Sequence, residues 1–220
     1  MKLIEAFSSK INYVRGDLTQ IEKILSAISG LLWRQGEITE DDFCVPKLIY
    51  GLMKDLNERM ANVYSEQYGL KTLCFRPCYV FGTGREAAKV GRLFNDLISD
   101  PALGNSFQTE FAPWPYLWTY VDDVTRFIRV LLDTPSPKYR IYNMGGWTVT
   151  SAEVGEIVKR YIPDAKITFG KENVDLGTPR KIINARARED LGFNLTPLKD
   201  SVLLHINEAR AEAGLSPIKA

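Results

Sequence analysis

The chain has 220 residues, of which 45% are hydrophobic and 25% are charged, the balance of a globular protein with one substantial core. Its 28 lysines and arginines nearly cancel its 27 aspartates and glutamates, which leaves a formal net charge of +1. Proteins that bind nucleic acid or anionic membranes usually carry a clear excess of positive charge, so the composition argues against both as partners.

The predicted elements alternate between strands and helices along most of the chain, which is typical of an α/β protein. In chain order they are a strand at Ile11–Val14, a helix at Gln20–Ser29, a loop over Gly30–Pro46, a helix at Lys47–Tyr68, a strand at Lys71–Val80, a helix at Ala88–Ile98, a loop over Pro101–Leu117, a strand at Trp118–Val121, a helix capped by Asp122-Asp123 and reaching Leu132, a strand at Ile141–Asn143, a helix from Thr150-Ser151 to Tyr161, a strand at Lys166–Phe169, and helices at Ala185–Leu191 and Leu198–Ala213.

The cysteines and the histidine limit the chemistry that this chain can perform. Cys44, Cys74 and Cys78 have no disulfide-framework spacing, and the amino-terminal residues contain no apolar stretch like a signal peptide, which predicts a cytoplasmic protein. His205 is the only histidine, so neither a histidine metal cluster nor a Ser-His-Asp triad can be assembled. We expect His205 to lie on the surface of the last helix.

Tyr50 and Lys54 form the main candidate for chemistry. Residues four apart share one helical face, so the phenol and the ammonium can meet on one ligand. A nearby cation favours the phenolate, whose reference pKa is about 10, and would let Tyr50 act as general acid or base. The alternative is a solvated lysine beside a partly buried tyrosine on a surface helix, and the spacing alone favours this alternative.

Several segments resemble, in the same order, those of the extended short-chain dehydrogenase/reductase superfamily, which includes the NAD-dependent epimerase/dehydratase family. The matching segments are Pro46 to Phe81 with Tyr50-Gly51, Lys54, Arg76-Pro77 and Val80-Phe81-Gly82, then Gly82-Thr83-Gly84-Arg85, Tyr120-Val121-Asp122-Asp123-Val124, Tyr142-Asn143 with Gly145-Gly146, and Leu191-Gly192-Phe193. The resemblance implies an NAD- or NADP-binding protein that acts on a small molecule, with a nucleotide sugar as one such substrate.

The resemblance also assigns roles to individual residues. Tyr50 and Lys54 would be catalytic and would contact the cofactor. Asp17 and Leu18 would lie near the adenine, although a turn-forming aspartate is an equally good interpretation of Asp17. The remaining candidates are Pro77 and Cys78 beside the nicotinamide, and Tyr79 and Arg85 toward the substrate. The alternative for Cys78 is a small buried strand residue, and Arg85 is equally compatible with a solvated loop arginine.

The sequence departs from the family in two places. It contains no glycine-rich G-x-x-G-x-x-G or G-x-G-x-x-G turn, which would let a helix amino terminus approach the pyrophosphate. Between Ser29 and Glu37 the family would also have two strands, a helix and the catalytic Ser or Thr. The predicted fold is therefore an incomplete Rossmann-like, doubly wound sheet with a small carboxy-terminal α/β substrate-binding lobe.

Two parts are predicted. Residues 1–84 would form the truncated cofactor-binding part, and residues 85–220 mainly the substrate-binding lobe, with Trp118–Leu132 and Ile141–Asn143 returning toward the first part. The leading hypothesis is an NAD(P)-dependent epimerase, dehydratase or reductase. One alternative is a catalytically inactive remnant of such an enzyme that serves as a binding or oligomerisation module. Another is a small-molecule sensor. The helix Lys47–Tyr68 could support a homodimer, because its apolar stripe Leu52, Leu56, Met60 and Val63 suits either a subunit interface or the core, the core being the commoner use.

Overall fold

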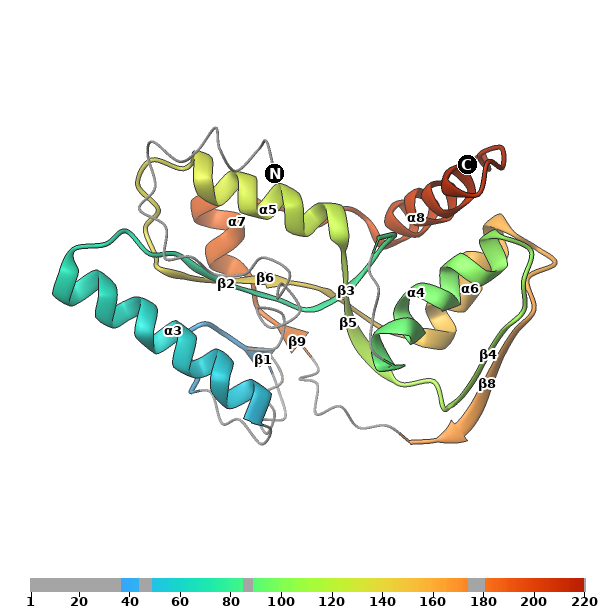
Figure 1. Ribbon diagram of the computed structural model, residues 1–220, viewed down its shortest axis with the longest axis horizontal. Coiled ribbons are helices and arrows are strands. Elements are labelled where there is room, and N and C mark those ends of the chain that lie inside the picture. The colour runs from blue at the N-terminus through green and yellow to red at the C-terminus, as the bar shows by residue number, and fades with distance from the viewer. Residues whose placement is uncertain (1–36, 44–48, 85–88, 174–180, 220) are drawn as a thin grey trace.

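The computed structural model describes residues 37–43, 49–84, 89–173 and 181–219 (Figure 1). Its elements, numbered as in Figure 1, are β1 (Glu37–Ile38), α3 (Ile49–Tyr68), β2 (Cys74–Pro77), β3 (Tyr79–Phe81), α4 (Lys89–Ala102), β4 (Phe107–Phe111), β5 (Pro115–Tyr120), α5 (Val121–Asp133), β6 (Ile141–Gly145), β7 (Trp147–Thr150), α6 (Ser151–Tyr161), β8 (Ile167–Glu172), β9 (Lys181–Ile182), α7 (Ala185–Leu191) and α8 (Leu198–Glu212).

Most strand pairs are parallel, as expected when helical segments separate the strands along the chain. Strand β2 pairs with β6, β3 with β5, β4 with β8, and β1 with β9, all in parallel. The antiparallel pair is β5 with β7. The predicted α/β class is therefore confirmed, and the ends of β2 and β6 meet where Pro77 lies opposite Gly145.

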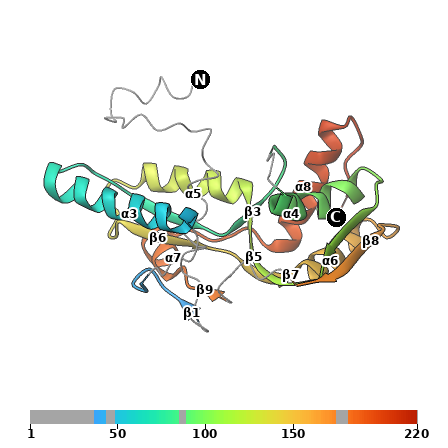
Figure 2. The ribbon, with the colours of Figure 1, turned by 60° about the horizontal axis from the view of Figure 1, so that its bottom comes forward.

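The helices form two groups on either side of the β3–β5 pair (Figures 1 and 2). Helices α3, α5 and α7 surround the β2–β6 pair, while α4, α6 and α8 pack together beside β4 and β8. Two apolar clusters follow this division. The larger is centred on Phe81, Phe94 and Trp118, and the smaller on Phe127 and Tyr142.

Local sequence signals explain several element boundaries. Gly69 follows α3 with φ +67°, a conformation that glycine adopts without strain. Thr150 caps α6 through a capping box, in which Glu153 N–H donates to the Thr150 hydroxyl at 3.1 Å and the Glu153 carboxylate accepts from Thr150 N–H at 2.7 Å. Both boundaries agree with the prediction.

Three predictions about elements were wrong. The stretch 101–117 is not a loop, because it contains β4 and the start of β5, and the stretch 30–46 contains the short strand β1. The side chains of Asp122 and Asp123 do not cap α5, whose cap residue is Tyr120 without a side-chain hydrogen bond. The predicted strand 11–14 and helix 20–29 lie outside the described residues.

His205 is fully buried and not on the helix surface as predicted. Its Nε2 lies 2.8 Å from the Ser99 hydroxyl on α4, and its ring stacks 6.0 Å from Phe81. Burial lowers the pKa of His205 to about 4. The imidazole is therefore a neutral core group that joins α8 to α4.

Candidate functional site

Helix α3 presents its polar side to the protein and its apolar side outward. Gly51 and Lys54 are its buried residues, and Lys54 is only 5% exposed. By contrast, Leu56 and Met60 are 53% and 44% exposed. The predicted apolar stripe is consequently not a core face, and the side turned toward the sheet carries charged and small residues.

Two contacts set the register of α3 against β2. Thr72, just before the strand, donates its hydroxyl to the carbonyl of Ala61 at 3.0 Å, and Arg76 in the strand binds Glu58. Helix and strand therefore run in opposite directions. Lys54, one helical turn before Glu58, therefore lies toward the carboxy-terminal end of β2.

Tyr50 and Lys54 come together at the start of α3. The Lys54 ammonium lies 5.6 Å from the centre of the Tyr50 ring, and the tyrosine is half-buried. The burial of Lys54 removes the interpretation of this residue as a solvated lysine. An ammonium taken out of water interacts with a neighbouring phenol more strongly than a surface ammonium does.

Pro77 and Cys78 lie where β2 ends and β3 begins. A Cβ on Gly146 would lie 3.0 Å from Cys78 Cβ and 3.1 Å from its Sγ, so a larger residue there would have to displace Cys78 or the β5 backbone by a few tenths of an ångström. Burial raises the pKa of the Cys78 thiol to about 12, and a hydrogen bond with Thr119 opposes the increase. The Cys78 side chain is thus an inert buried group.

Tyr79 was predicted to face cofactor and substrate. Its ring stacks on Phe94 of α4 with 5.0 Å between centroids and an interplanar angle of 7°, and its edge meets Tyr116 at 5.6 Å. The tyrosine is half-buried within the aromatic part of the larger cluster. Asp17, Leu18 and Arg85 lie outside the described residues.

The structure shows side-chain contacts that the sequence interpretation did not predict. Glu58 and Arg76 form a buried ion pair beneath α3, and the i, i+4 spacing from Lys54 to Glu58 was the available signal. Glu208 accepts hydrogen bonds from the hydroxyls of Tyr120 and Thr83, the latter at 3.0 Å. These contacts join α8 to the ends of β3 and β5, and no local sequence pattern predicts them.

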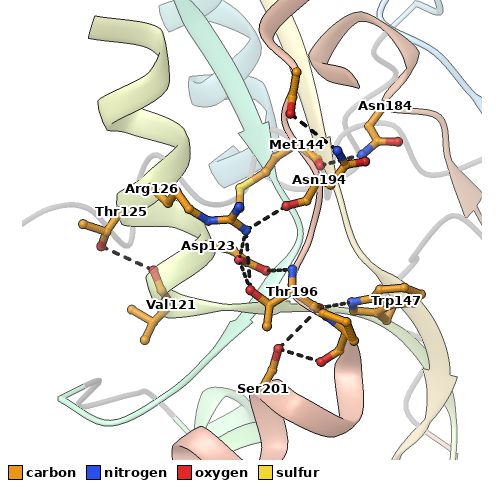
Figure 3. Close-up of polar contacts among 12 residues, drawn as sticks. Val121, Asp123, Thr125, Arg126, Met144, Trp147, Asn184, Asn194, Thr196 and Ser201 are labelled. Carbon is orange, nitrogen blue, oxygen red and sulfur yellow. Dashed lines mark hydrogen bonds and ion pairs between the residues drawn. The ribbon is translucent and has the colours of Figure 1, made fainter. Parts of the chain in front are cut away.

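Asp123 is a buried acid at the start of α5 (Figure 3). Its carboxylate accepts from the Thr196 backbone N–H at 2.9 Å and from the Thr196 hydroxyl at 2.7 Å, and it pairs with Arg126. Trp147 Nε1 donates to the Thr196 carbonyl at 2.9 Å. Asp123 therefore fixes the segment that leads into α8.

The described residues fit one half of a dinucleotide. Tyr50 and the buried Lys54 supply a hydroxyl and a cation on the inner side of α3, toward the end of the sheet at which β2 finishes. Such donors suit a nicotinamide ribose. The 220 residues contain no glycine-rich turn of the kind that binds the pyrophosphate.

The described residues lack a metal cluster and a membrane-spanning helix. Within the ranges that the structure describes, no three His, Cys, Asp or Glu side chains are grouped so as to hold a metal ion. Likewise, none of the helices described there is both long enough and apolar enough to cross a membrane.

Parallel strands joined by helices, with a Tyr/Lys pair beside the strand ends, define an α/β protein of the nucleotide-binding kind. A family model described as the NAD dependent epimerase/dehydratase family matches residues 16–145. The chain belongs to this family.

Two curated proteins are similar in sequence to much of this chain. The chain is 26% identical over 162 residues to the mitochondrial L-threonine 3-dehydrogenase of Sus scrofa, covering 69% of this chain and 43% of the relative. The Bos taurus enzyme of the same name is 25% identical over 184 residues, covering 77% of this chain and 49% of the relative. The chain therefore spans less than half the length of these relatives.

Solved structures show the same fold at low identity. A GalE-like L-threonine dehydrogenase from Cupriavidus necator, in its holo form, matches with a TM-score of 0.74 and 18% identity, covering 84% of this chain and 63% of that one. UDP-glucose 4-epimerase from Thermotoga maritima matches with a TM-score of 0.70 and 20% identity, covering 86% and 62%. The predicted Rossmann-like fold is confirmed.

Proposed function

We propose that this protein is an NAD(P)-dependent oxidoreductase that exchanges hydride with the hydroxyl or carbonyl carbon of a small molecule. The observation that supports the proposal is the buried Lys54 ammonium, 5.6 Å from the Tyr50 ring centre on the inward side of α3. Tyr50 would move the proton of the substrate hydroxyl, while Lys54 would stabilise its phenolate and bind a ribose. The nicotinamide, when bound, would supply the hydride chemistry.

The other predicted site residues keep their proposed roles. Pro77 and Cys78 would contact the cofactor through the backbone, and Tyr79 would line the substrate-binding side of the site. Asp17 and Leu18 would lie near the adenine, and Arg85 would bind an anionic substrate group. The proposed division into 1–84 and 85–220 is compatible with the β2–β6 and β3–β5 pairs, in which strands from the two parts lie side by side.

For the substrate, we favour a small hydroxy amino acid of the L-threonine class over a nucleotide sugar. The curated relatives reported above are named as L-threonine 3-dehydrogenases. The start of β5 also carries Tyr116 and Leu117, each 1% exposed, where a cation for a diphosphate would be needed. A nucleotide sugar remains the second candidate, because one solved relative is a UDP-glucose 4-epimerase.

Titration of the purified protein with NADH and NADPH, followed by nicotinamide fluorescence, tests the cofactor proposal. Saturable binding should weaken at least about tenfold in Lys54→Met, which loses a charged hydrogen bond to the ribose. Tyr64→Phe is the matched control, since Tyr64 lies on the outer side of the same helix. Turnover with L-threonine and with UDP-glucose then separates the two substrate classes, and Tyr50→Phe should abolish either activity.

A catalytically inactive remnant is the alternative, and the absence of the glycine-rich turn favours it. It predicts that correctly folded protein binds neither NADH nor NADPH at millimolar concentration. Such a result would reject the oxidoreductase proposal for this chain. Location is a separate proposal: the cysteine pattern favours the cytoplasm, which imaging of a tagged chain would check.

We also propose a homodimer through α3. Its outward side carries Leu52, Leu56, Met60 and Val63, each at least 44% exposed. An apolar stripe of this length on an outer helix face is the pattern of a subunit interface. A two-fold pairing of α3 with the same helix of a second copy would cover it.

Sedimentation velocity tests the dimer with Met60→Glu and with Thr125→Glu, a charge-matched control on the exposed side of α5. We expect a dimer for the wild type and the control, and a monomer for Met60→Glu. A wild-type monomer at every concentration would reject the dimer without touching the oxidoreductase proposal.

A further inference from the structure

Strand β2 has one paired edge and one edge that no other described strand meets. Among the described strands it pairs with β6 alone, and Cys74 N–H donates to the Arg140 carbonyl at 2.7 Å. Successive strand residues direct their backbone N–H and C=O groups to opposite edges. Cys74 therefore points these groups toward β6, and Phe75 points them the other way. We call the edge formed by the backbone of Leu73, Phe75 and Pro77 the open edge of β2.

Both faces of β2 are covered, which is the environment of an interior strand. Arg76 points to α3, where it binds Glu58. Phe75 points to the opposite face, where its ring centroid lies 5.6 Å from that of Phe127 in α5. Parallel strands covered on both faces normally have a neighbour on each side, because a row of unpaired backbone groups inside a protein is costly. The open edge of β2 is therefore a place for one more strand.

The open edge suits a short strand. Pro77 has no N–H to donate, and the register between β2 and β6 shifts between Arg76 and Pro77, so regular pairing ends there. This leaves the four residues from Leu73 to Arg76. Leu73, at the start of the edge, is 39% exposed, and an apolar strand beside it would cover its side chain.

We propose that residues Ile11–Val14 form a strand that pairs with the open edge of β2 in the same molecule. This stretch, Ile-Asn-Tyr-Val, is the four-residue strand predicted from the sequence, and it lies outside the described residues. The 22 residues between Val14 and Glu37 give the chain enough length to reach the edge. A tether of this kind gives the segment an effective concentration on the order of a millimolar, which favours it over the same segment of a second copy.

The pairing is parallel in this proposal. The predicted helix at Gln20–Ser29 and helix α3 separate Ile11–Val14 from β2 along the chain, and helical connections are what parallel strands require. The carboxy-terminal ends of parallel strands lie at one end of a sheet. The turn that contains Asp17 would then lie at the end of the sheet where β2 finishes. The pairing itself depends neither on cofactor binding nor on the proposed chemistry of Tyr50.

Disulfide scanning of the full chain tests the pairing. The starting variant Cys44→Ser retains Cys74 in β2 as the anchor. Single cysteines then replace Ile11, Asn12, Tyr13 and Val14 in turn. Neighbouring strands lie about 4.8 Å apart, within the Cα separation that a disulfide spans. After mild oxidation and peptide mapping by mass spectrometry, we expect disulfides to Cys74 at alternate positions, either 11 and 13 or 12 and 14, because side chains alternate between faces.

A second series moves the anchor by one residue. In Cys74→Ser/Leu73→Cys the anchor lies on the opposite face, so the reactive positions should change to the other alternating pair. Non-reducing electrophoresis distinguishes disulfides within one chain from those between two chains. Equal reaction at all four positions, or none at any of them, in protein with the wild-type circular dichroism spectrum would overturn the proposal. Disulfides formed only between two chains would assign the open edge to a second copy and would also overturn it.

Amide hydrogen exchange, resolved by NMR, gives an independent measurement. The Phe75 N–H points away from β6, so its slow exchange in the wild type requires a partner at the open edge. The double variant Asn12→Pro/Tyr13→Pro lacks a strand N–H on either edge, and in it the Phe75 N–H should exchange at least about tenfold faster. The Arg76 N–H, which points toward β6, is the internal control. Exchange of Phe75 at the rate of an unprotected amide in the wild type would overturn the proposal, whatever the result of the NADH titration.

Discussion

Replacing Asp123 by alanine should destabilise the protein by about 3 kcal/mol. The carboxylate is 1% exposed and accepts two short hydrogen bonds from Thr196, at 2.9 Å and 2.7 Å. Hydrogen bonds to a charged group contribute about 1.5–3 kcal/mol each, and we take the lower value because Arg126 already shares the charge. The Arg126 side chain is 48% exposed, so its ion pair adds at most about 1 kcal/mol.

Urea unfolding followed by circular dichroism and by tryptophan fluorescence measures this change. Trp147 hydrogen-bonds to the Thr196 carbonyl and so reports on the same segment (Figure 3). Asp123→Asn keeps one acceptor oxygen and should lose about half as much stability. Thr125→Ala is the control, since its hydroxyl is on an exposed turn of α5 and bonds Val121 at 3.4 Å. If Asp123→Ala falls within about 0.5 kcal/mol of this control, the buried network does not stabilise the fold.

Three further predictions concern single groups. The free energy of unfolding should fall by about 3 kcal/mol as the pH drops from about 6.5 toward 4. The reason is that His205 becomes protonated in the unfolded state, while burial keeps its pKa in the folded state near 4. His205→Gln should make the urea midpoint less dependent on pH in this range. Thr150→Ala should cost about 1 kcal/mol through loss of the capping box, measured by the same urea series, and an unchanged midpoint would count against the cap. Cys78, with a thiol pKa raised to about 12, should react with iodoacetamide only after unfolding; rapid labelling of the native protein, located by mass spectrometry, would contradict its burial.

The sequence predicted best where a signal is local. The capping box of Thr150 and Glu153 lies within four residues, and the helix with Tyr50 and Lys54 has a periodic pattern closed by a glycine. These features depend on backbone geometry that the neighbouring residues determine. The order of strands and helices followed from them, and so did the α/β class.

Non-local partners account for the failures. His205 was placed on the surface because its polar ring lies within an ordinary helical pattern, yet its partner Ser99 is 106 positions away. Strand β4 was missed because proline-containing stretches flank its short alternation of buried and exposed residues, and its pairing strand β8 comes about 60 residues later. Nothing local distinguishes a buried histidine with one distant hydroxyl from an exposed one.

Helix α3 shows why periodicity alone could not identify the inner face. Its apolar stripe and its polar stripe have the same repeat, and burial of either stripe satisfies an amphipathic helix. Here the polar side faces the sheet, because Arg76 in β2 binds Glu58 and Lys54 is buried one turn away. Burying these charges costs free energy unless they are paired. Leaving the apolar side chains of Leu56 and Met60 in water also loses the stabilisation that their burial would give. An inner ligand that uses Lys54 and an outer partner that covers the apolar stripe would offset both costs, which is why the cofactor and dimer proposals stem from the same helix.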